Sequence, residues 1–139
     1  MDINNIITAL DNDNNYSVAN LSKAKIKCIN NDILQKLQLP KETLKSYNEK
    51  LKNYRYIDDI NNINMFSYIR YIKLNDPNNL TLKNPCKLYG IIEKKDKISL
   101  KCSIANKIFF CINYNEYLVF QKLSQQEEII LSIVDYLDK

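Results

Sequence analysis

Residues 94–104 decide the fold, and they read Lys94-Lys95-Asp96-Lys97-Ile98-Ser99-Leu100-Lys101-Cys102-Ser103-Ile104. From residue 98 onward apolar and polar side chains alternate, which is the period-2 pattern of a half-buried strand. The four polar residues before that point are typical of the tip of a hairpin. The stretch therefore predicts an antiparallel hairpin with one face turned toward a core.

Four more strand-like stretches surround this hairpin. Together with 98–104, the predicted strands are 67–74, 80–93, 107–113 and 117–122. Pro85 interrupts the second of them, and proline is expected there at a bulge, a bend or an edge. Five strands joined by short turns favour an antiparallel meander over 67–123, curled into a small barrel of the SH3 or OB kind.

A helical hairpin and connector is predicted ahead of the strands, over 23–66. Asn31 or Asp32 is expected to cap a first short helix, and Pro40 suits the start of a second. An apolar stripe then follows at helical spacing, formed by Leu44, Tyr47, Leu51 and Tyr54. This pattern predicts two helices with an apolar seam between them and lysines on the outside.

The two ends of the chain have different characters. Residues 124–139 predict a C-terminal helix, because Ser124 and Glu127 have the spacing of a capping box. Its apolar face must pack on the barrel, on the N-terminal helices or on a second copy of the chain. Residues 1–22 are rich in Asn and Asp and are expected to form a loose arm. The predicted fold class is α+β.

The composition argues against catalysis and against cofactors. The 139 residues include no His, which is the commonest general base and metal ligand, and one glycine, which excludes phosphate-cradling loops. The four cysteines lack the CxxC spacing of zinc sites, and we expect Cys102 and Cys111 to be small buried apolar residues. We therefore expect a protein that is not an enzyme and has no metal site and no cofactor.

Positive charge is concentrated in two segments. Residues 23–55 hold nine basic and three acidic side chains, and residues 67–123 hold ten and four, whereas the whole chain has a net charge of +4. Acidic segments lie between and beside them. Locally basic modules of this kind favour an anionic partner such as nucleic acid.

Basic and aromatic residues are interleaved along the predicted strands. Lysine and arginine neutralise phosphates, and tyrosine stacks on bases. The candidate nucleic-acid-binding residues in this region are Arg70, Lys73, Lys101, Tyr68 and Tyr71. The alternative is that lysines solvate the exterior while tyrosines fill the core and rim. For Arg70 specifically, the alternative is an ion pair with Asp58 or Asp59.

A second pattern lies in the predicted helical hairpin. Residues 37–47 resemble the turn and recognition helix of helix-turn-helix proteins, which would direct Lys41 and Lys45 into the major groove. Gln38 stands where that turn usually has Gly, and Leu34 stands where the preceding helix usually has a small residue. The pattern therefore makes Lys41 and Lys45 further candidate nucleic-acid contacts.

Three stretches carry a resemblance to known proteins. Residues 51–60, 67–72 and 120–128 contain Tyr-Arg-Tyr before an acidic linker, Tyr-Ile-Arg in a strand, and Phe-Gln-Lys-Leu-Ser at a helix start. Over residues 50–139 the chain resembles small uncharacterised proteins of giant nucleocytoplasmic large DNA viruses of the Mimivirus kind. The resemblance implies a virion or a viral factory in host cytoplasm, and it implies no catalytic residue.

Two functional classes follow from these observations. The first is a viral binding module that contacts nucleic acid through phosphates, with a helix-turn-helix regulator as one variant. The second is a structural or adaptor protein that binds other viral proteins, or a second copy of itself, through its alternating charge blocks. No membrane partner is expected, since the apolar runs are far too short to span a bilayer.

Overall fold

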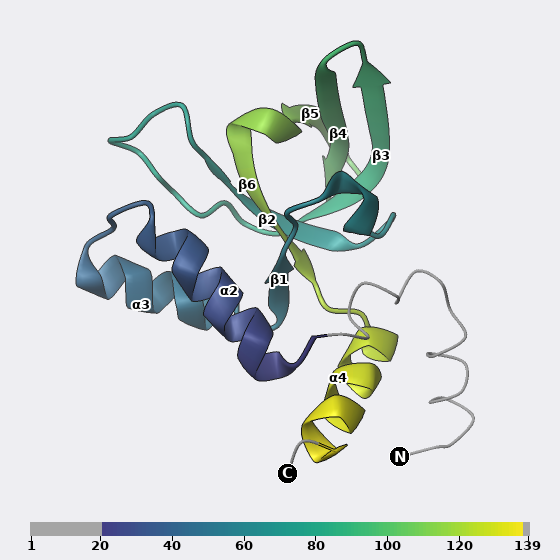
Figure 1. Ribbon diagram of the computed structural model, residues 1–139. Helices are drawn as coiled ribbons and strands as arrows, with labels where there is room; N and C mark the ends of the chain where they lie inside the picture. Colours follow the sequence, from purple (N-terminus) through teal and green to yellow (C-terminus); the bar gives the residue numbers. More distant parts are fainter. Residues whose placement is uncertain (1–20, 138–139) are drawn as a thin grey trace. The chain divides into compact units, whose positions relative to one another are not determined.

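A computed structural model describes residues 21–137 (Figure 1). The predicted arm falls almost entirely on residues 1–20, outside the described part. The chain divides into two compact units, which we describe separately. The helical unit comprises residues 21–55 and 123–137 of the described chain, and the sheet unit comprises Tyr56–Lys122.

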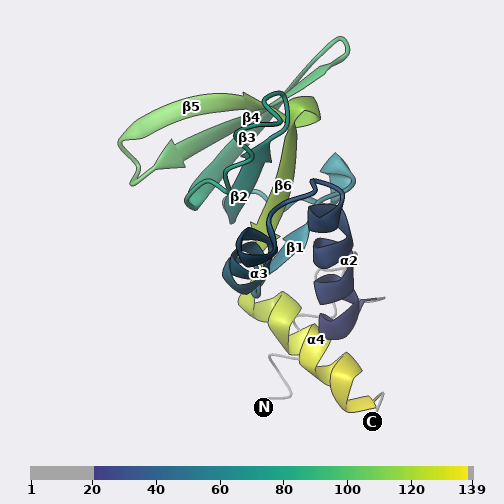
Figure 2. The same cartoon turned by 90° about the vertical axis from the view of Figure 1, so that its left-hand side faces the viewer.

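The helical unit begins with α2, Lys23–Gln35 (Figure 2). Ser22 is its N-cap and accepts a hydrogen bond from the Lys25 backbone N–H at 3.1 Å. The prediction that Asn31 or Asp32 would cap this helix is wrong, because both residues lie inside it. The buried face of α2 consists of Ile26, Asn30 and Leu34. Because Asn30 is polar, the apolar stripe is broken in the middle of the helix, and the sequence pattern does not reveal that the helix begins before it.

Helix α3 follows as Lys41–Lys50. Pro40 directly precedes it as the N-cap, which confirms the predicted start. The helix is shorter than the apolar stripe indicated, since Leu51 is its C-cap and Tyr54 begins strand β1 (Tyr54–Tyr56). Leu51 and Tyr54 are nevertheless buried.

Helix α4, Gln125–Leu137, starts with the predicted capping box. The Ser124 N–H donates to Glu127 Oε1 at 3.0 Å, and the Glu127 N–H donates to Ser124 Oγ at 3.1 Å. The apolar face of α4 packs within the helical unit, where Ile130 and Leu131 share a buried cluster with Leu123 and Ile26 of α2. Three packing partners were predicted for this face, and the one found in the cluster is the N-terminal helical region, through Ile26 of α2.

The sheet unit contains the five predicted strands at nearly the predicted positions. They are β2 (Tyr68–Lys73), β3 (Cys86–Lys94), β4 (Lys97–Ile104), β5 (Ile108–Asn113) and β6 (Tyr117–Lys122). Short 3-10 turns occur at η2 (Ile60–Asn62) and η3 (Tyr114–Glu116). Pro85 immediately precedes β3, a position where its lack of a backbone N–H removes no hydrogen bond within the strand.

The strands form one antiparallel sheet in the order β1-β6-β2-β3-β4-β5. The predicted count of five strands is wrong, because β1 adds a sixth. Strands β2 to β5 form the expected meander, and β6 returns to pair with β2 from Ile69↔Gln121 to Lys73↔Tyr117. The sheet is not closed, so the predicted barrel is not confirmed: β1 and β5 remain at its two ends.

One face of this sheet carries the core of the sheet unit. Its central residues are fully buried and come from alternate positions of neighbouring strands: Ile69, Leu88, Leu100, Cys102 and Val119. The predicted alternation of β4 is therefore confirmed in its middle. It fails at the end of the strand, where Ile104 is exposed beside the turn into β5.

Candidate functional site

Exposed aromatic side chains gather on the sheet unit, away from its core cluster. We call Phe66, Tyr68, Tyr89 and Phe109 the aromatic strip. Phe66 is 61% exposed, Phe109 54% and Tyr68 50%, while Tyr89 is half-buried. Large aromatic rings left in water in such a cluster mark a binding surface more often than scattered single residues do.

Strand register aligns the strip across four strands. Tyr68 of β2 pairs with Lys87 of β3, Lys87 pairs with Ser103 of β4, and Ser103 pairs with Phe109 of β5. Directly opposite residues in antiparallel strands project to the same face. Their sequence neighbours Ile69, Leu88 and Cys102 belong to the core, so this line of residues occupies the opposite face.

A β-bulge brings the central ring of the strip into place. The pairing of β3 with β4 shifts between Leu88 and Gly90, which leaves Tyr89 as the extra residue. Its ring centroid lies 6.0 Å from that of Phe66 and 5.6 Å from that of Phe109, in edge-to-face geometry. The Tyr89 hydroxyl donates a hydrogen bond to Asn106 Oδ1 in the turn between β4 and β5. Tyr89 is therefore held in the middle of a row of three rings.

Two lysines supply positive charge to the same face. Lys87 places Nζ 5.6 Å from the centroid of the Tyr89 ring, within the range of a cation–π contact. Lys101 is exposed on β4 and alternates with the core residues Leu100 and Cys102. No ion pair joins either lysine to another residue in the described part of the chain. The ammonium groups are thus available to an anionic ligand lying along the rings.

Ser103 adds a polar group to the line between Lys87 and Phe109. It is 1% exposed, and its Oγ has no hydrogen-bond partner among residues 21–137. A buried hydroxyl without a partner costs about 1–3 kcal/mol.

Of the residues singled out by sequence, Tyr68, Arg70 and Lys101 lie on the face of the aromatic strip, Arg70 being two residues after Tyr68 in β2. Tyr71 lies on the core side, with ring centroids 5.4 Å from Tyr117 and 6.4 Å from Phe110. Burial raises the pKa of the Tyr71 hydroxyl to about 12. Lys73 is exposed at the last position of β2.

Arg70 bonds to a backbone carbonyl and not to Asp58 or Asp59, the ion-pair partners considered from the sequence. Its Nε donates to the backbone carbonyl of Lys83 at 3.0 Å. Within residues 21–137 the one ion pair joins Arg55 to Glu127, at 2.9 Å between Nε and Oε2. The Asp59 carboxylate instead accepts a hydrogen bond from the Asn61 backbone N–H. Arg70 is thus held by the loop before β3.

Lys41 and Lys45 are both exposed on α3 and belong to the helical unit. In the turn before that helix, Gln38 has a φ of 54°, in the left-handed region that glycine favours. Leu34, at the position usually occupied by a small residue, is fully buried. Gln38 therefore adopts a left-handed backbone without being a glycine.

Sequence reasoning missed Phe66, Lys87, Tyr89 and Phe109 as site residues. Phe66 falls in the predicted connector, where no strand pattern assigns it a face. Residues 108–112 are apolar on both faces of the predicted strand, so periodicity cannot tell which of Phe109 and Phe110 is exposed. The bulge at Tyr89 has no signal in the sequence beyond its neighbour Gly90.

The described residues offer little for metal or covalent chemistry. Residues 21–137 contain no group of three or more His, Cys, Asp or Glu side chains able to hold a metal ion. The cysteines are free thiols, with Cys86 and Cys102 buried and Cys28 and Cys111 exposed. The prediction that Cys111 is buried is wrong, because it lies on β5 at the position paired with the exposed Lys101. No described helix meets the length and apolarity needed to cross a bilayer.

Comparison of the chain with protein-family models, with curated protein sequences and with solved structures finds no significant match.

Proposed function

We propose that this protein is a non-enzymatic binding module that holds single-stranded nucleic acid on the aromatic strip. The observation that carries the proposal is the row of three rings, Phe66, Tyr89 and Phe109, with Lys87 against the central one. Successive unpaired bases stack on aromatic rings, while lysines neutralise the phosphates beside them. In a duplex the faces of the bases are covered by neighbouring base pairs, so they are not accessible for stacking on these rings.

The finer fold interpretation accompanies this proposal. Pairing of β6 with β2 joins the last strand of the sheet unit to its first, as a small barrel of the SH3 or OB kind requires. We propose that the sheet is a partly open member of that class. The viral setting, in host cytoplasm or in a virion, stays a prediction from the resemblance.

The test is a titration of a fluorescently labelled oligothymidine with the full chain, followed by anisotropy at several salt concentrations. With about three phosphate contacts, log affinity should fall with log salt at a slope of about −2. The same sequence annealed to its complement should bind at least tenfold more weakly. Equal affinity for both forms, or binding that ignores salt, would overturn the proposal.

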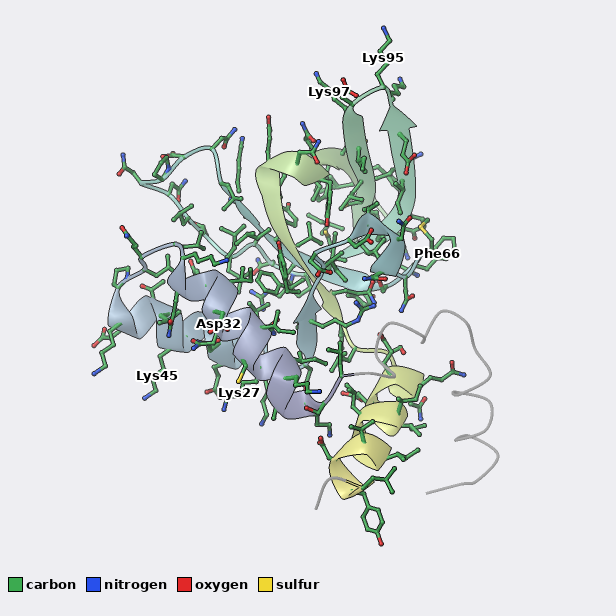
Figure 3. The ribbon with its side chains drawn as sticks, in the orientation of Figure 1. Lys27, Asp32, Lys45, Phe66, Lys95 and Lys97 are labelled. Atoms are coloured by element: carbon green, nitrogen blue, oxygen red, sulfur yellow. The ribbon has the colours of Figure 1, made fainter. Side chains whose placement is uncertain are left out.

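Matched variants locate the binding surface. Tyr89→Ala and Phe109→Ala should each weaken single-strand binding about tenfold or more, since a stacked base contributes roughly 1–3 kcal/mol. Tyr136→Ala removes an aromatic side chain that is 77% exposed on α4 and should change nothing. Lys87→Gln should weaken binding more than Lys97→Gln at the tip of the β3–β4 hairpin, which Figure 3 labels.

A protein partner is the alternative, favoured by the exposed Ile104 and Ile108 at the β4–β5 turn. These aliphatic side chains enlarge the exposed apolar surface, but they have no hydrogen-bonding group or aromatic ring that could recognise a base. In that case the oligonucleotide should not bind, and light scattering should report self-association that Ile108→Ser abolishes. The helix-turn-helix variant instead predicts duplex binding that depends on Lys41 and Lys45.

A further inference from the structure

The helical unit contains a pocket that the proposed function does not use. Its volume is about 820 Å³, within the range of sites for small organic ligands. The lining comes from α2, α3, residues 51–53 after α3, Leu123 and Glu128 at the start of α4. Every lining residue belongs to the helical unit, so none is shared with the aromatic strip.

Polar contacts tie the walls of this pocket together. The Asn48 side-chain amide on α3 donates to Asn31 Oδ1 on α2 at 2.9 Å. The Asn30 amide on α2 donates to the carbonyl of Tyr54 at 2.9 Å, and the Leu123 N–H donates to the carbonyl of Asn53 at 2.8 Å. Because these bonds link three segments distant in sequence (α2, residues 48–54 and Leu123), the walls of the pocket are held together without a ligand.

The floor is aliphatic. Its apolar lining residues are Ala24, Ile26, Leu44, Leu51 and Leu123. Among residues 21–137 no aromatic side chain lines the pocket, so a nucleotide base or other flat ring would find no described ring to stack on. Burial of an aliphatic chain on such a floor contributes about 0.8 kcal/mol per CH₂. The floor therefore suits an aliphatic body.

The rim is positively charged. Lys23 and Lys27 are one turn apart on α2, Lys41 and Lys45 are one turn apart on α3, and Lys52 follows α3. Like charges at this spacing weaken a helix slightly. Figure 3 shows Lys27 and Lys45 extending from the two helices on the same side. Two carboxylates, Glu49 and Glu128, also line the pocket.

The five lysines form no ion pair with any described residue, so the rim presents ammonium groups in excess over carboxylates. We propose that the pocket binds an amphiphilic organic anion, with an aliphatic chain on the floor and a carboxylate or phosphate head between the lysine pairs. The argument is charge complementarity joined to an aliphatic interior. It does not depend on the proposed function, because the two sites have different residues.

The test is isothermal titration of the full chain with decyl phosphate and with decanoate, each below its micellar concentration. Both should bind with one-to-one stoichiometry, and the tighter of the two identifies the head group. 1-Decanol, which has the same chain without charge, should bind at least tenfold more weakly, and inorganic phosphate and adenosine monophosphate should bind more weakly still. Amide shifts in a nitrogen–proton correlation spectrum should be confined to the helical unit.

Variants separate the rim from general charge effects. Lys41→Gln combined with Lys45→Gln should weaken decyl phosphate binding roughly tenfold, since each exposed ion pair contributes up to about 1 kcal/mol. Lys50→Gln removes one positive charge from the same helix outside this pocket and should leave binding within twofold, whereas a pure net-charge effect would cost half the free energy lost in the double variant. Leu44→Gln should weaken the anions and decanol alike, with the helical circular dichroism unchanged.

Three results would overturn the proposal. One is absence of binding by either anion at millimolar concentration to chain whose fold is verified by circular dichroism. Another is decanol binding as tightly as the anions, which would leave the lysines without a role. The third is a loss of binding free energy in Lys50→Gln that is half the loss in the double variant, which would show that only net charge matters.

Discussion

At the scale of single residues, the buried ion pair of Arg55 and Glu127 is the most consequential contact in the helical unit. The two side chains are 5% and 0% exposed. Glu127 also accepts the Ser124 N–H at the start of α4. One carboxylate therefore accepts hydrogen bonds from a buried guanidinium and from the N-terminus of a helix, and it joins residues 72 positions apart in sequence.

Glu127→Ala should accordingly destabilise the protein by about 3–5 kcal/mol, because it breaks a buried ion pair and removes the acceptor of the Ser124 N–H. Glu128→Ala removes the neighbouring, half-buried carboxylate and should cost less than about 1 kcal/mol. Urea unfolding monitored by circular dichroism measures both. The double variant Arg55→Met with Glu127→Leu should recover most of the loss; equal costs for the two single alanine variants would contradict this account.

Two half-buried tyrosines predict how stability responds to alkaline pH. Burial raises the pKa of Tyr71 and of Tyr114 to about 12 from the ordinary value of 10. The folded state therefore retains protons that the unfolded chain releases. The stabilisation is complete below pH 10 and is lost as the pH rises from 10 toward 12.

Urea midpoints at pH 8, 10 and 11 should thus fall steeply between the last two values, and Tyr71→Phe should flatten the decline. Tyr68→Phe serves as the control, because Tyr68 is half exposed, and it should leave the decline as it is. A profile for Tyr71→Phe that parallels the wild type would show that this hydroxyl ionises as freely in the folded state as in the unfolded one.

At the scale of elements, the turn between α2 and α3 holds a non-glycine residue in the left-handed region. Gln38 has a φ of 54°, a conformation that glycine adopts without the clash of a Cβ. Gln38→Gly should therefore stabilise the protein by about 0.5–1 kcal/mol, measured by urea unfolding. Gln35→Gly, at the last residue of α2, should destabilise it by a similar amount. A loss of stability in both would mean that the Gln38 side chain contributes more than its backbone costs.

The same elements show what the sequence could and could not predict. The limits of β2, β4, β5 and β6 lie within one or two residues of those predicted, because turns and alternation mark them. The start of α2 was missed since Asn30 is buried by a hydrogen bond to Tyr54, a residue 24 positions away. Strand β1 was missed because a strand of three residues is too short to show an alternation of apolar and polar side chains.

The candidate site was predictable only in part, for a related reason. Lys101 could be found because it occupies a polar position of an alternating strand, and Tyr68 because basic and aromatic residues are interleaved along its strand. Tyr89 and Phe66 come together through a bulge and a non-helical connection, and these depend on tertiary pairing. Composition indicated the kind of partner, whereas register determined which residues lie side by side.

At the scale of the whole molecule, positive charge occurs in both units but in two different settings. In the sheet unit Lys87 lies against an aromatic ring. In the helical unit Lys41 and Lys45 border an aliphatic pocket. Rings beside cations suit a chain of bases, and alkyl groups beside cations suit a single amphiphilic anion. The net charge of +4 alone cannot distinguish these two partners.

The final prediction is that the two sites bind independently. Since they share no residue, saturating decyl phosphate should change the dissociation constant of the oligothymidine by less than twofold at constant ionic strength. By linkage, the oligothymidine should change that of decyl phosphate equally little. Tyr89→Ala should leave decyl phosphate binding intact, and the Lys41→Gln, Lys45→Gln double variant should leave oligothymidine binding intact. Competition between the two ligands would instead assign Lys41 and Lys45 to the nucleic-acid surface, as the helix-turn-helix pattern in the sequence predicts.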